Sequence, residues 1–503
     1  MDGCNSDKEK GERIRHLERN GAANLTLWQS VKRYRNVVWC CLGLTTTILL
    51  YGYDYVIVGA TSAMPSFQRD FGSKHEGRWI IPSLWLGLWT LASPGGSILG
   101  AIAGGQIQDW VGRRASIAIG CFLSAIAVAI CYVSYMPADI GTRRGVFLGG
   151  KTFQGLTIGI VTTTTHTYMS EILPPSLRGP VLAFFPMFTL LGQLIGASVI
   201  FGLMAMPDGY AVGFASQWPF SAVPVIVALC IPESPTYLVR KNKMAQAHKS
   251  QKRLEPRDGD AHETVETIRR NIEHEREMTQ ATYIDCFKRA NLRRTLIIML
   301  SGALPQILGL ALLAKASYFF QVIGVSADVS VILLIVGIVC GLLANMASIW
   351  VLHRVGRRRL LVWGLFGVSF LWLTMGISGI WDKKPTTEYT TFSMIAIVVV
   401  AGISAWPASY AVAASVSGFV SPYLYNADAA NLRSKVGFVY AGLCAVAGVV
   451  SYFHVPEMKG RTPAEIDGMF EAMLPARDFG TWTASPSTSS RTADESTGER
   501  SIT

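Results

Sequence analysis

Long apolar stretches alternate with short polar segments along most of the chain. Each stretch has about 20 residues or more, which is the length that a helix needs to cross the hydrocarbon core of a bilayer. The first six cover 37–60, 79–103, 115–135, 146–167, 180–205 and 211–231. The next five cover 295–314, 327–352, 359–381, 391–420 and 434–455. This pattern predicts an all-α polytopic membrane protein with two groups of spans.

The polar segments divide the chain into five parts. We expect a tail at 1–36, a helix bundle at 37–231, a central loop at 232–294, a second bundle at 295–455 and a tail at 456–503. Within the central loop, 261–278 mixes charges with spaced apolar residues and predicts a short surface helix. Beyond about 481 the chain is rich in Ser and Thr, so we expect disorder there.

Composition agrees with a membrane protein. Charged residues make up 16% of the 503 residues and hydrophobic residues 50%, whereas ordinary soluble domains carry about 25% charged residues. This composition excludes a disordered protein, a nucleic-acid binder and a disulfide-rich secreted scaffold. The net charge of +11 fits the excess of Lys and Arg that membrane proteins carry in their cytosolic segments.

The positions of Lys and Arg predict the orientation. They collect in the tail before residue 37, in 240–294, and in the turns at 113–114 and 354–359. The segments 206–210 and 321–329 contain neither. We therefore expect the N-terminus, the central loop and the basic turns on the cytosolic side of a multi-pass protein, most simply in the plasma membrane.

The segment GGQIQDWVGRR (104–114) has the form G-x-x-x-D-x-x-G-R-R, and HRVGRRR (353–359) is a shorter copy in the second half. Glycines permit close packing and a tight turn, and an acid can pair with arginines that hold helix ends together. These residues are Gly105, Asp109, Gly112, Arg113 and Arg114. The alternative is that the two arginines only anchor the helix end on the inner side.

With these motifs the chain resembles the sugar porter family of the major facilitator superfamily. Three further segments resemble motifs of that family: YMSEILPPSLRG (168–179), PESPTYL (232–238) and PEMKGRTPAEIDGMFE (456–471). The stretches YGYDYVIVGATSAMPSFQRDFG (51–72) and YFFQVIG (318–324) are similar to fungal maltose and α-glucoside permeases. The resemblance covers about 45–475 and implies that the C-terminal tail is cytosolic as well.

The resemblance implies two six-helix bundles around a central cavity and alternating access to a substrate near the membrane midplane. It also implies a cytosolic gate, in which charged side chains hold helix ends together until the cavity opens inward. Single surface ion pairs contribute little to stability, but networks contribute more. The expected gate residues are Gly105, Asp109, Arg113, Arg114, Glu171, Arg178, Glu233, Arg357 and Arg358.

Two charges fall inside predicted spans, where a charge is costly and often functional. Asp54 lies in the first span and Lys151 opens the fourth, at a place where sugar porters usually have Arg. We hypothesise that Asp54 binds the driving proton and that Lys151 tunes its affinity for that proton. The alternative is a static ion pair between two helices.

The resemblance implies substrate contacts at Gln193, Gln306, Lys315, Tyr318 and Tyr410. Amide side chains suit sugars because they both donate to and accept from hydroxyl groups. However, Pro186 and Ala311 stand where related proteins carry amides, and Lys315 stands near a usual Tyr. Lys315 either snorkels to an interface or indicates an anionic or non-sugar substrate. For His166 we expect a buried, hydrogen-bonded side chain rather than a proton relay.

The second half departs from the family pattern of twelve spans, because only eleven stretches are present. AWPASY (405–410) and SPYLYN (421–426) resemble motifs of the tenth and eleventh spans, and part of the sequence between them is missing. The stretch 391–420 could form one span, or two short helices or a re-entrant hairpin broken near Pro407. The chain could also be a shortened form that is impaired in transport.

We therefore expect a secondary active transporter that takes up a sugar (maltose, another α-glucoside or a hexose) together with protons. The alternative is a transporter of the same fold for a non-sugar molecule such as a fungal secondary metabolite, including its export. No nucleophile elbow, phosphate loop or metal-ligand spacing appears, so we expect neither an enzyme nor a cofactor. The expected partners are the substrate, protons and membrane lipid, with no nucleic acid, and the protein is expected to be a monomer.

Overall fold

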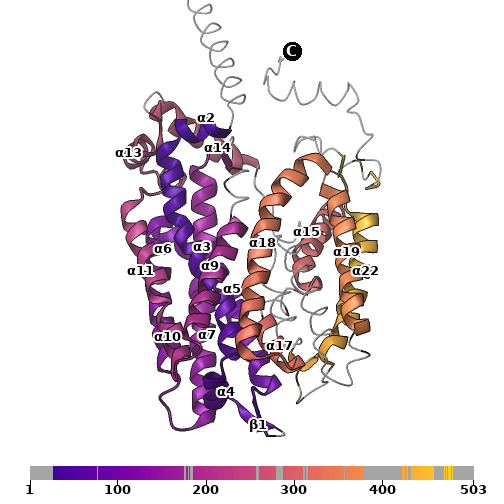
Figure 1. Cartoon of the computed structure of the whole chain (residues 1–503). Helices are drawn as coiled ribbons and strands as arrows, with labels where there is room; N and C mark the ends of the chain where they lie inside the picture. Colours follow the sequence, from indigo (N-terminus) through magenta and orange to yellow (C-terminus); the bar gives the residue numbers. More distant parts are fainter. Residues whose placement is uncertain are drawn as a thin grey trace, which may run out of the picture.

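The structure is a computed structural model. It describes residues 27–75, 77–174, 177–178, 181, 185–256, 260–278, 287–309, 312, 315–355, 357–378, 380, 422–424, 426, 428, 432–457, 469–470, 472, 474–476 and 479. These residues are almost entirely helical, and the two halves of the chain stand side by side (Figure 1). The predicted all-α polytopic fold is confirmed.

The first half contains α2 (Leu27–Arg33) and then the predicted spans. These are α3 (Arg35–Ser62), α5 (Ser83–Val111), α6 (Arg113–Val133), α7 (Ile140–Ile172), α9 (Phe185–Leu203), α10 (Gly209–Ala215) and α11 (Trp218–Cys230). The helices extend beyond several predicted spans, because polar residues at the ends of a helix lie outside an apolar core. α7 is the clearest case, since it runs from the Asp139 cap to beyond Glu171.

The predicted span 211–231 is two helices rather than one. α10 ends at Ala215, and α11 begins at Trp218 with a proline, Pro219, in its first turn. Proline lacks a backbone N–H and fits the first turn of a helix better than its interior. The break places Ser216 and Gln217 between the two helices, and the Gln217 side chain is buried in the bundle.

The second half contains α15 (Arg289–Ile307), α17 (Ala316–Ile323), α18 (Ala327–Val355), α19 (Arg357–Ser378), η2 (Arg433–Lys435) and α22 (Val436–His454). The expectation of one span at 295–314 is corrected, because α15 ends at Ile307 and Gly309 has a positive φ of 89°. The chain becomes helical again in α17, partly in a segment expected to be a loop. The stretch 391–420 lies outside the described residues, so its arrangement stays a prediction.

Eight helical segments among the described residues are long and apolar enough to cross a membrane, when α10 and α11 are taken together as one segment, Gly209–Cys230. α7 is not one of the eight, although it has 33 residues. Its middle carries Lys151, Gln154 and four threonines at 162–165, which lower its hydropathy. Lys151 and Gln154 are buried among neighbouring helices and form part of the candidate site.

The two ends of the bundle differ in their covering elements. One end, which we call the basic end, carries α12 (Pro235–Arg240), α13 (Met244–Leu254) and α14 (Ala261–Met278), of which α14 confirms the predicted surface helix (Figure 1). The other end, the far end, carries α4 (Pro65–Phe71), β1 (Ser73–His75), β2 (Arg78–Ile80) and α17. The antiparallel strands pair Ser73 with Ile80, Lys74 with Trp79 and His75 with Arg78.

Glycines bring α5 and α7 into backbone contact. A Cβ atom at Gly100 would lie 2.0 Å from the carbonyl oxygen of Leu156, and one at Gly155 would lie 2.2 Å from that of Ser93. Small residues allow this approach, which strengthens dispersion contacts between membrane helices. The close packing fixes α5, which supplies Ser93, against α7, which supplies Lys151.

Candidate functional site

Asp54 and Lys151 form a direct ion pair in the interior of the first half. Their side chains are 2% and 1% exposed, and the Lys151 ammonium donates to Asp54 Oδ1. Asp54 Oδ2 accepts a second hydrogen bond from the Ser93 hydroxyl at 2.7 Å. α3, α5 and α7 therefore meet at one carboxylate, and its charge is compensated by an ammonium group and a hydroxyl.

A chain of two buried amides extends from this pair. Lys151 Nζ donates to Gln154 Oε1 at 2.9 Å, and Gln154 Nε2 donates to Gln217 Oε1 at 2.6 Å. Gln217 Nε2 is buried and has no hydrogen-bond partner among the described residues. Sequence reasoning did not include Gln154 or Gln217 in the site. Gln154 could have been identified, because it lies three positions after Lys151 on the same helix and therefore on the same face.

The residues expected to contact substrate do not gather at one place among the described residues. Gln193 lies on α9 with a half-buried side chain that makes no hydrogen bond among those residues. Gln306 lies near the end of α15, but its side chain is outside the description. Tyr410 is also outside the described residues. The roles of these three residues stay predictions.

Lys315 and Tyr318 instead lie in the contact between the two halves at the far end. Lys315 Nζ donates to the Leu86 carbonyl oxygen at 3.1 Å, and the side chain is 2% exposed, so it does not snorkel to an interface. The Tyr318 hydroxyl donates to Asn426 Oδ1 at 3.3 Å and accepts the Ile81 N–H at 3.3 Å. Tyr318 therefore joins the two halves at the far end.

Further hydrogen bonds join the halves at the same end. Gln68 Nε2 donates to Gln321 Oε1 at 2.7 Å, and Ser317 donates to the Gly59 carbonyl oxygen at 3.1 Å. Asp428 accepts both the backbone N–H and the hydroxyl of Ser83. These pairs were not predicted, because their members lie more than 200 residues apart in the sequence.

His166 is hydrogen-bonded, as expected, but it is not buried. Its Nδ1 lies 2.9 Å from the Thr162 carbonyl oxygen and donates to it, and its ring stacks on Phe185 with centroids 4.0 Å apart. The side chain is nevertheless exposed, so the prediction of burial is wrong. The hydrogen bond to the preceding turn occupies one ring nitrogen.

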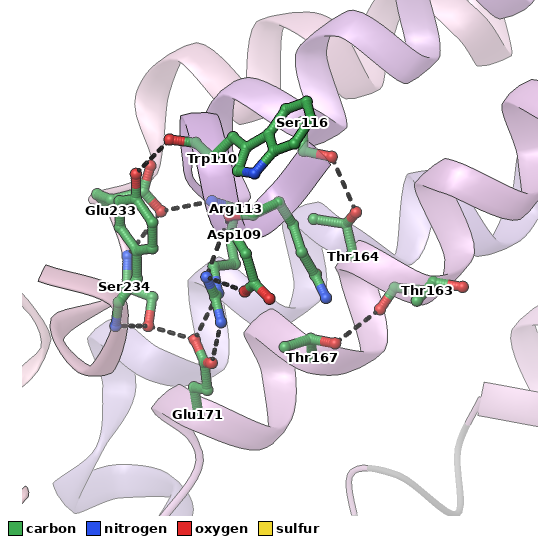
Figure 2. A network of polar contacts seen from close by, with 12 residues as sticks. Asp109, Trp110, Arg113, Ser116, Thr163, Thr164, Thr167, Glu171, Glu233 and Ser234 are labelled. Carbon is green, nitrogen blue, oxygen red and sulfur yellow. Dashed lines mark hydrogen bonds and ion pairs between the residues drawn. The ribbon is translucent and has the colours of Figure 1, made fainter. Parts of the chain in front are cut away.

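At the basic end, Arg113 joins three of the predicted gate residues (Figure 2). Its guanidinium donates to both carboxylate oxygens of Glu171, at 2.9 and 3.1 Å, and its Nη1 lies 3.2 Å from Asp109 Oδ1. Arg113 is 2% exposed, so this two-point ion pair is shielded from water. Arg113 is the first residue of α6 and therefore lies beside the end of α7.

Glu233 completes this network through the start of α6. Its Oε1 accepts the backbone N–H groups of Arg113 at 2.9 Å and Arg114 at 3.2 Å, as a carboxylate does at a helix N-terminus. Gly112 has a φ of 99°, and a Cβ atom there would lie 2.5 Å from Glu233 Oε2, so glycine is required for this approach.

Tyr237 covers the network. Its ring lies 5.0 Å from the Arg113 guanidinium carbon, and its hydroxyl donates to the Trp110 carbonyl oxygen at 3.0 Å. Burial, and then the neighbouring Glu233 charge, raise the pKa of Tyr237 above its usual value. The hydroxyl therefore remains a donor throughout the physiological range.

The side chains of the other predicted gate residues lie outside this network. Arg178 is exposed and donates to the Ser170 carbonyl oxygen at 2.9 Å, whereas Arg114 donates to backbone carbonyls at the end of α11. Arg358 donates from its backbone N–H to Glu457 at 3.2 Å in the second half, and the Arg357 side chain is outside the description. Gly105 has open space where a Cβ would lie, so the expectation of close packing there is wrong.

Comparisons with known proteins agree with this architecture. Residues 39–420 match the family described as "Sugar (and other) transporter". The chain is 28% identical to the MFS transporter fmqE of Aspergillus fumigatus, over 92% of each chain. It is 30% identical to the alpha-glucosides permease MPH3 of Saccharomyces cerevisiae, over 88% of this chain and 78% of that one.

A solved structure gives the same fold. The xylose transporter XylE from E. coli, in a partially occluded inward-open conformation, superimposes with a TM-score of 0.69 and 19% sequence identity. The match covers 85% of this chain and 100% of XylE. At this level of identity the likeness supports the fold, and the sequence match to the family supports the kind of protein.

Proposed function

We propose, on the premise that the chain belongs to the sugar (and other) transporter family, that it carries a sugar across the membrane together with a proton. As a member of this family it is a multi-pass membrane transporter and not an enzyme. The observation that carries the proposal is the buried Asp54–Lys151 pair, because such a pair is costly unless it has a function or a compensating network. A fungal relative named as an α-glucoside permease supports a sugar as the substrate.

The geometry suggests how Asp54 would act. A proton on Asp54 removes the negative charge that Lys151 contacts, and so weakens the ion pair. Lys151 also holds Gln154, which in turn holds Gln217. Loss of the ion pair would therefore loosen a chain of contacts that links α3, α7 and the break between α10 and α11. Gln217 Nε2 is a buried donor without a partner among the described residues, and a hydroxyl group of the substrate could accept its hydrogen bond.

Alternating access is supported by the distribution of contacts between the halves. The hydrogen bonds between them that are described above all lie at the far end. At the basic end, the Arg113 network lies within the first half alone. If the basic end faces the cytosol, as the Lys and Arg distribution predicts, this conformation is closed to the outside. The plasma membrane and cytosolic termini belong to the same proposal.

The test is uptake of labelled maltose and glucose by yeast that lacks its own sugar transporters, at pH 5 and pH 7.5. We expect uptake to be faster at pH 5 and to lose this pH dependence in Asp54→Asn, with surface expression measured for both. Ser93→Ala is a milder control, because it removes one hydrogen bond to Asp54 but leaves the carboxylate. Sugar uptake by Asp54→Asn with unchanged pH dependence would exclude the proton role of Asp54.

A second candidate function is transport of an anionic or non-sugar molecule, which Lys315 favours. Its buried ammonium has no carboxylate within ion-pair distance among the described residues, so a substrate anion could compensate its charge. The fungal relative fmqE is named only as an MFS transporter, so its name does not specify a sugar. Sugar uptake by Lys315→Gln at the rate of the wild type favours a sugar as the substrate. A wild type that is well expressed but takes up no sugar favours an anionic or non-sugar substrate.

A further inference from the structure

A cavity of about 380 Å³ opens at the basic end, between the start of α6, the end of α11, and α12 and α13. We call it the basic cavity. Its lining includes Arg114, Glu233, Lys243, Lys249, Ser250 and Arg253. The volume is within the range of about 300–1,000 Å³ that small-molecule sites usually have. It is separate from the buried Asp54–Lys151 pair.

The lining has a strong excess of positive charge. Four cations (Arg114, Lys243, Lys249 and Arg253) line it against one carboxylate, Glu233. That carboxylate already accepts backbone N–H groups at the start of α6, so its charge is compensated without the four cations. Lys243, Lys249 and Arg253 are exposed, and within the described part of the chain their side chains make no ion pair or hydrogen bond.

The sequence of α13, MAQAHKSQKRL, explains why two of its cations, Lys249 and Arg253, line the same cavity. Gln246, Lys249 and Arg253 are separated by three and four residues, so they share one face of the helix. Ala247 and Leu254 lie on another face and are buried. The Ser250 hydroxyl donates to the Glu233 carbonyl oxygen and fixes α13 beside the network at the start of α6. Lys249 and Arg253 therefore stand on an anchored helix, and Lys243 lies directly before its first residue.

The cavity also lies next to the lipid-facing surface. α6 begins at Arg113 and α11 ends at Cys230, and both belong to candidate membrane spans. Ile226 and Leu229, on the last turns of α11, are 61% and 59% exposed. Trp110 is 72% exposed at the end of α5, where tryptophan typically marks the level of the lipid headgroups. Acyl chains can contact this apolar surface while a headgroup reaches the cations.

We infer that the basic cavity binds the phosphate groups of an anionic phospholipid headgroup. Phosphate oxygens accept hydrogen bonds from ammonium and guanidinium groups, and basic pockets at a membrane surface favour phosphorylated headgroups. The neighbouring apolar surface favours a lipid over free phosphate. A bound headgroup would contact both α6 and α13, and so would stabilise the packing of the central loop against the first bundle.

The test uses the full chain purified in detergent micelles, with the lipid dioctanoyl phosphatidylinositol 4-phosphate as the probe. Affinity and the rise in melting temperature are measured for this lipid, for phosphatidylcholine of the same chain length, and for inorganic phosphate and inositol 1,4-bisphosphate. The site variant is Lys249→Gln/Arg253→Gln. The matched control is Lys252→Gln/Arg270→Gln, which removes the same two kinds of charge from exposed positions outside the cavity lining.

We expect the phosphorylated lipid to bind and stabilise the wild type, and the site variant to bind it at least about tenfold more weakly, since each cation near a membrane surface contributes substantially to anionic lipid binding. The control variant should stay within about twofold of the wild type, and phosphatidylcholine should not compete. Equal weakening in both variants would reduce the effect to general charge and overturn the proposal. Soluble inositol 1,4-bisphosphate or inorganic phosphate binding as tightly as the lipid would overturn the assignment to a membrane lipid.

Discussion

Asp428 accepts two hydrogen bonds from Ser83, one from the backbone N–H at 2.7 Å and one from the hydroxyl group. Ser83 begins α5 in the first half, and Asp428 lies before α22 in the second. The carboxylate therefore satisfies a free N–H at a helix start and complements the helix dipole there. This single contact stabilises one helix end and also joins the two halves.

Removing this carboxylate should favour opening at the far end. In Asp428→Ala the closed arrangement loses two hydrogen bonds to a charged group, which together contribute about 1.5 kcal/mol or more. The ratio of open to closed molecules should then rise by roughly tenfold. The measurement is the rate at which an impermeant maleimide labels Ser317→Cys, since Ser317 is buried between the halves and donates to the Gly59 carbonyl.

A matched control is Asp139→Ala at the same end of the molecule. Asp139 also accepts an N–H at a helix start, that of Thr142 at 2.7 Å, but its hydrogen bonds stay within α7 and its first turn. This variant should leave the labelling rate of Ser317→Cys unchanged. Equal rates in wild type and Asp428→Ala would show that the Ser83 contact does not hold the far end closed.

The buried ion pair should show strong coupling between its two members. Asp54→Asn leaves the Lys151 ammonium without its carboxylate in the interior, and Lys151→Met leaves Asp54 without its cation, so each should lower the free energy of unfolding by about 3–5 kcal/mol. The double variant should recover much of this loss, because neither charge is then buried alone. Thermal unfolding in detergent micelles measures the cycle, and additive losses would show that the two charges do not interact.

Most of the fold could be predicted from the sequence, but only part of the site could. Apolar length predicted the spans, and the spacing of Asp109, Arg113 and the second glycine correctly predicted a turn and an ion pair. These features are local, since each depends on residues in one helix or one turn. The pairing of Asp54 with Lys151 could be predicted, because isolated charges in apolar spans need a partner.

The remaining features depend on three-dimensional contacts that no local pattern contains. Gln217 enters the site only because α10 and α11 are separate helices. Lys315 and Tyr318 follow the break after α15, and their contacts with Leu86 and Ile81 of the first half were not predicted, while their substrate role stays a prediction. Gly105 and Gly112 occupy the same motif, but only Gly112 faces another side chain closely. The spacing of residues in the sequence does not show which of two glycines in one motif faces a neighbouring side chain.

The backbone contact between α5 and α7 should not tolerate even one methyl group. In Gly100→Ala the added Cβ would lie 2.0 Å from the Leu156 carbonyl oxygen, so the helices must separate, at a cost of about 1–3 kcal/mol or more. Gly105→Ala lies on the same helix with open space around its Cβ and is the control. We expect a clearly lower melting temperature in detergent for the first variant and an unchanged or slightly higher one for the second. Similar melting temperatures for both would contradict the close packing.

The Arg113 network should depend on the shape of the guanidinium and not only on its charge. Arg113→Lys keeps the positive charge, but an ammonium cannot contact both oxygens of Glu171 and also the Gln108 carbonyl, which Arg113 Nη1 reaches at 3.1 Å. Because this group is buried, the lost hydrogen bonds should lower the free energy of unfolding by about 2–3 kcal/mol. Arg178→Lys is the control, since that side chain is exposed and its substitution should change stability by no more than about 0.5 kcal/mol. Thermal unfolding gives the stability, and uptake measured on the same variants separates it from transport. An Arg113→Lys protein as stable as the wild type would show that charge alone holds α6 to α7.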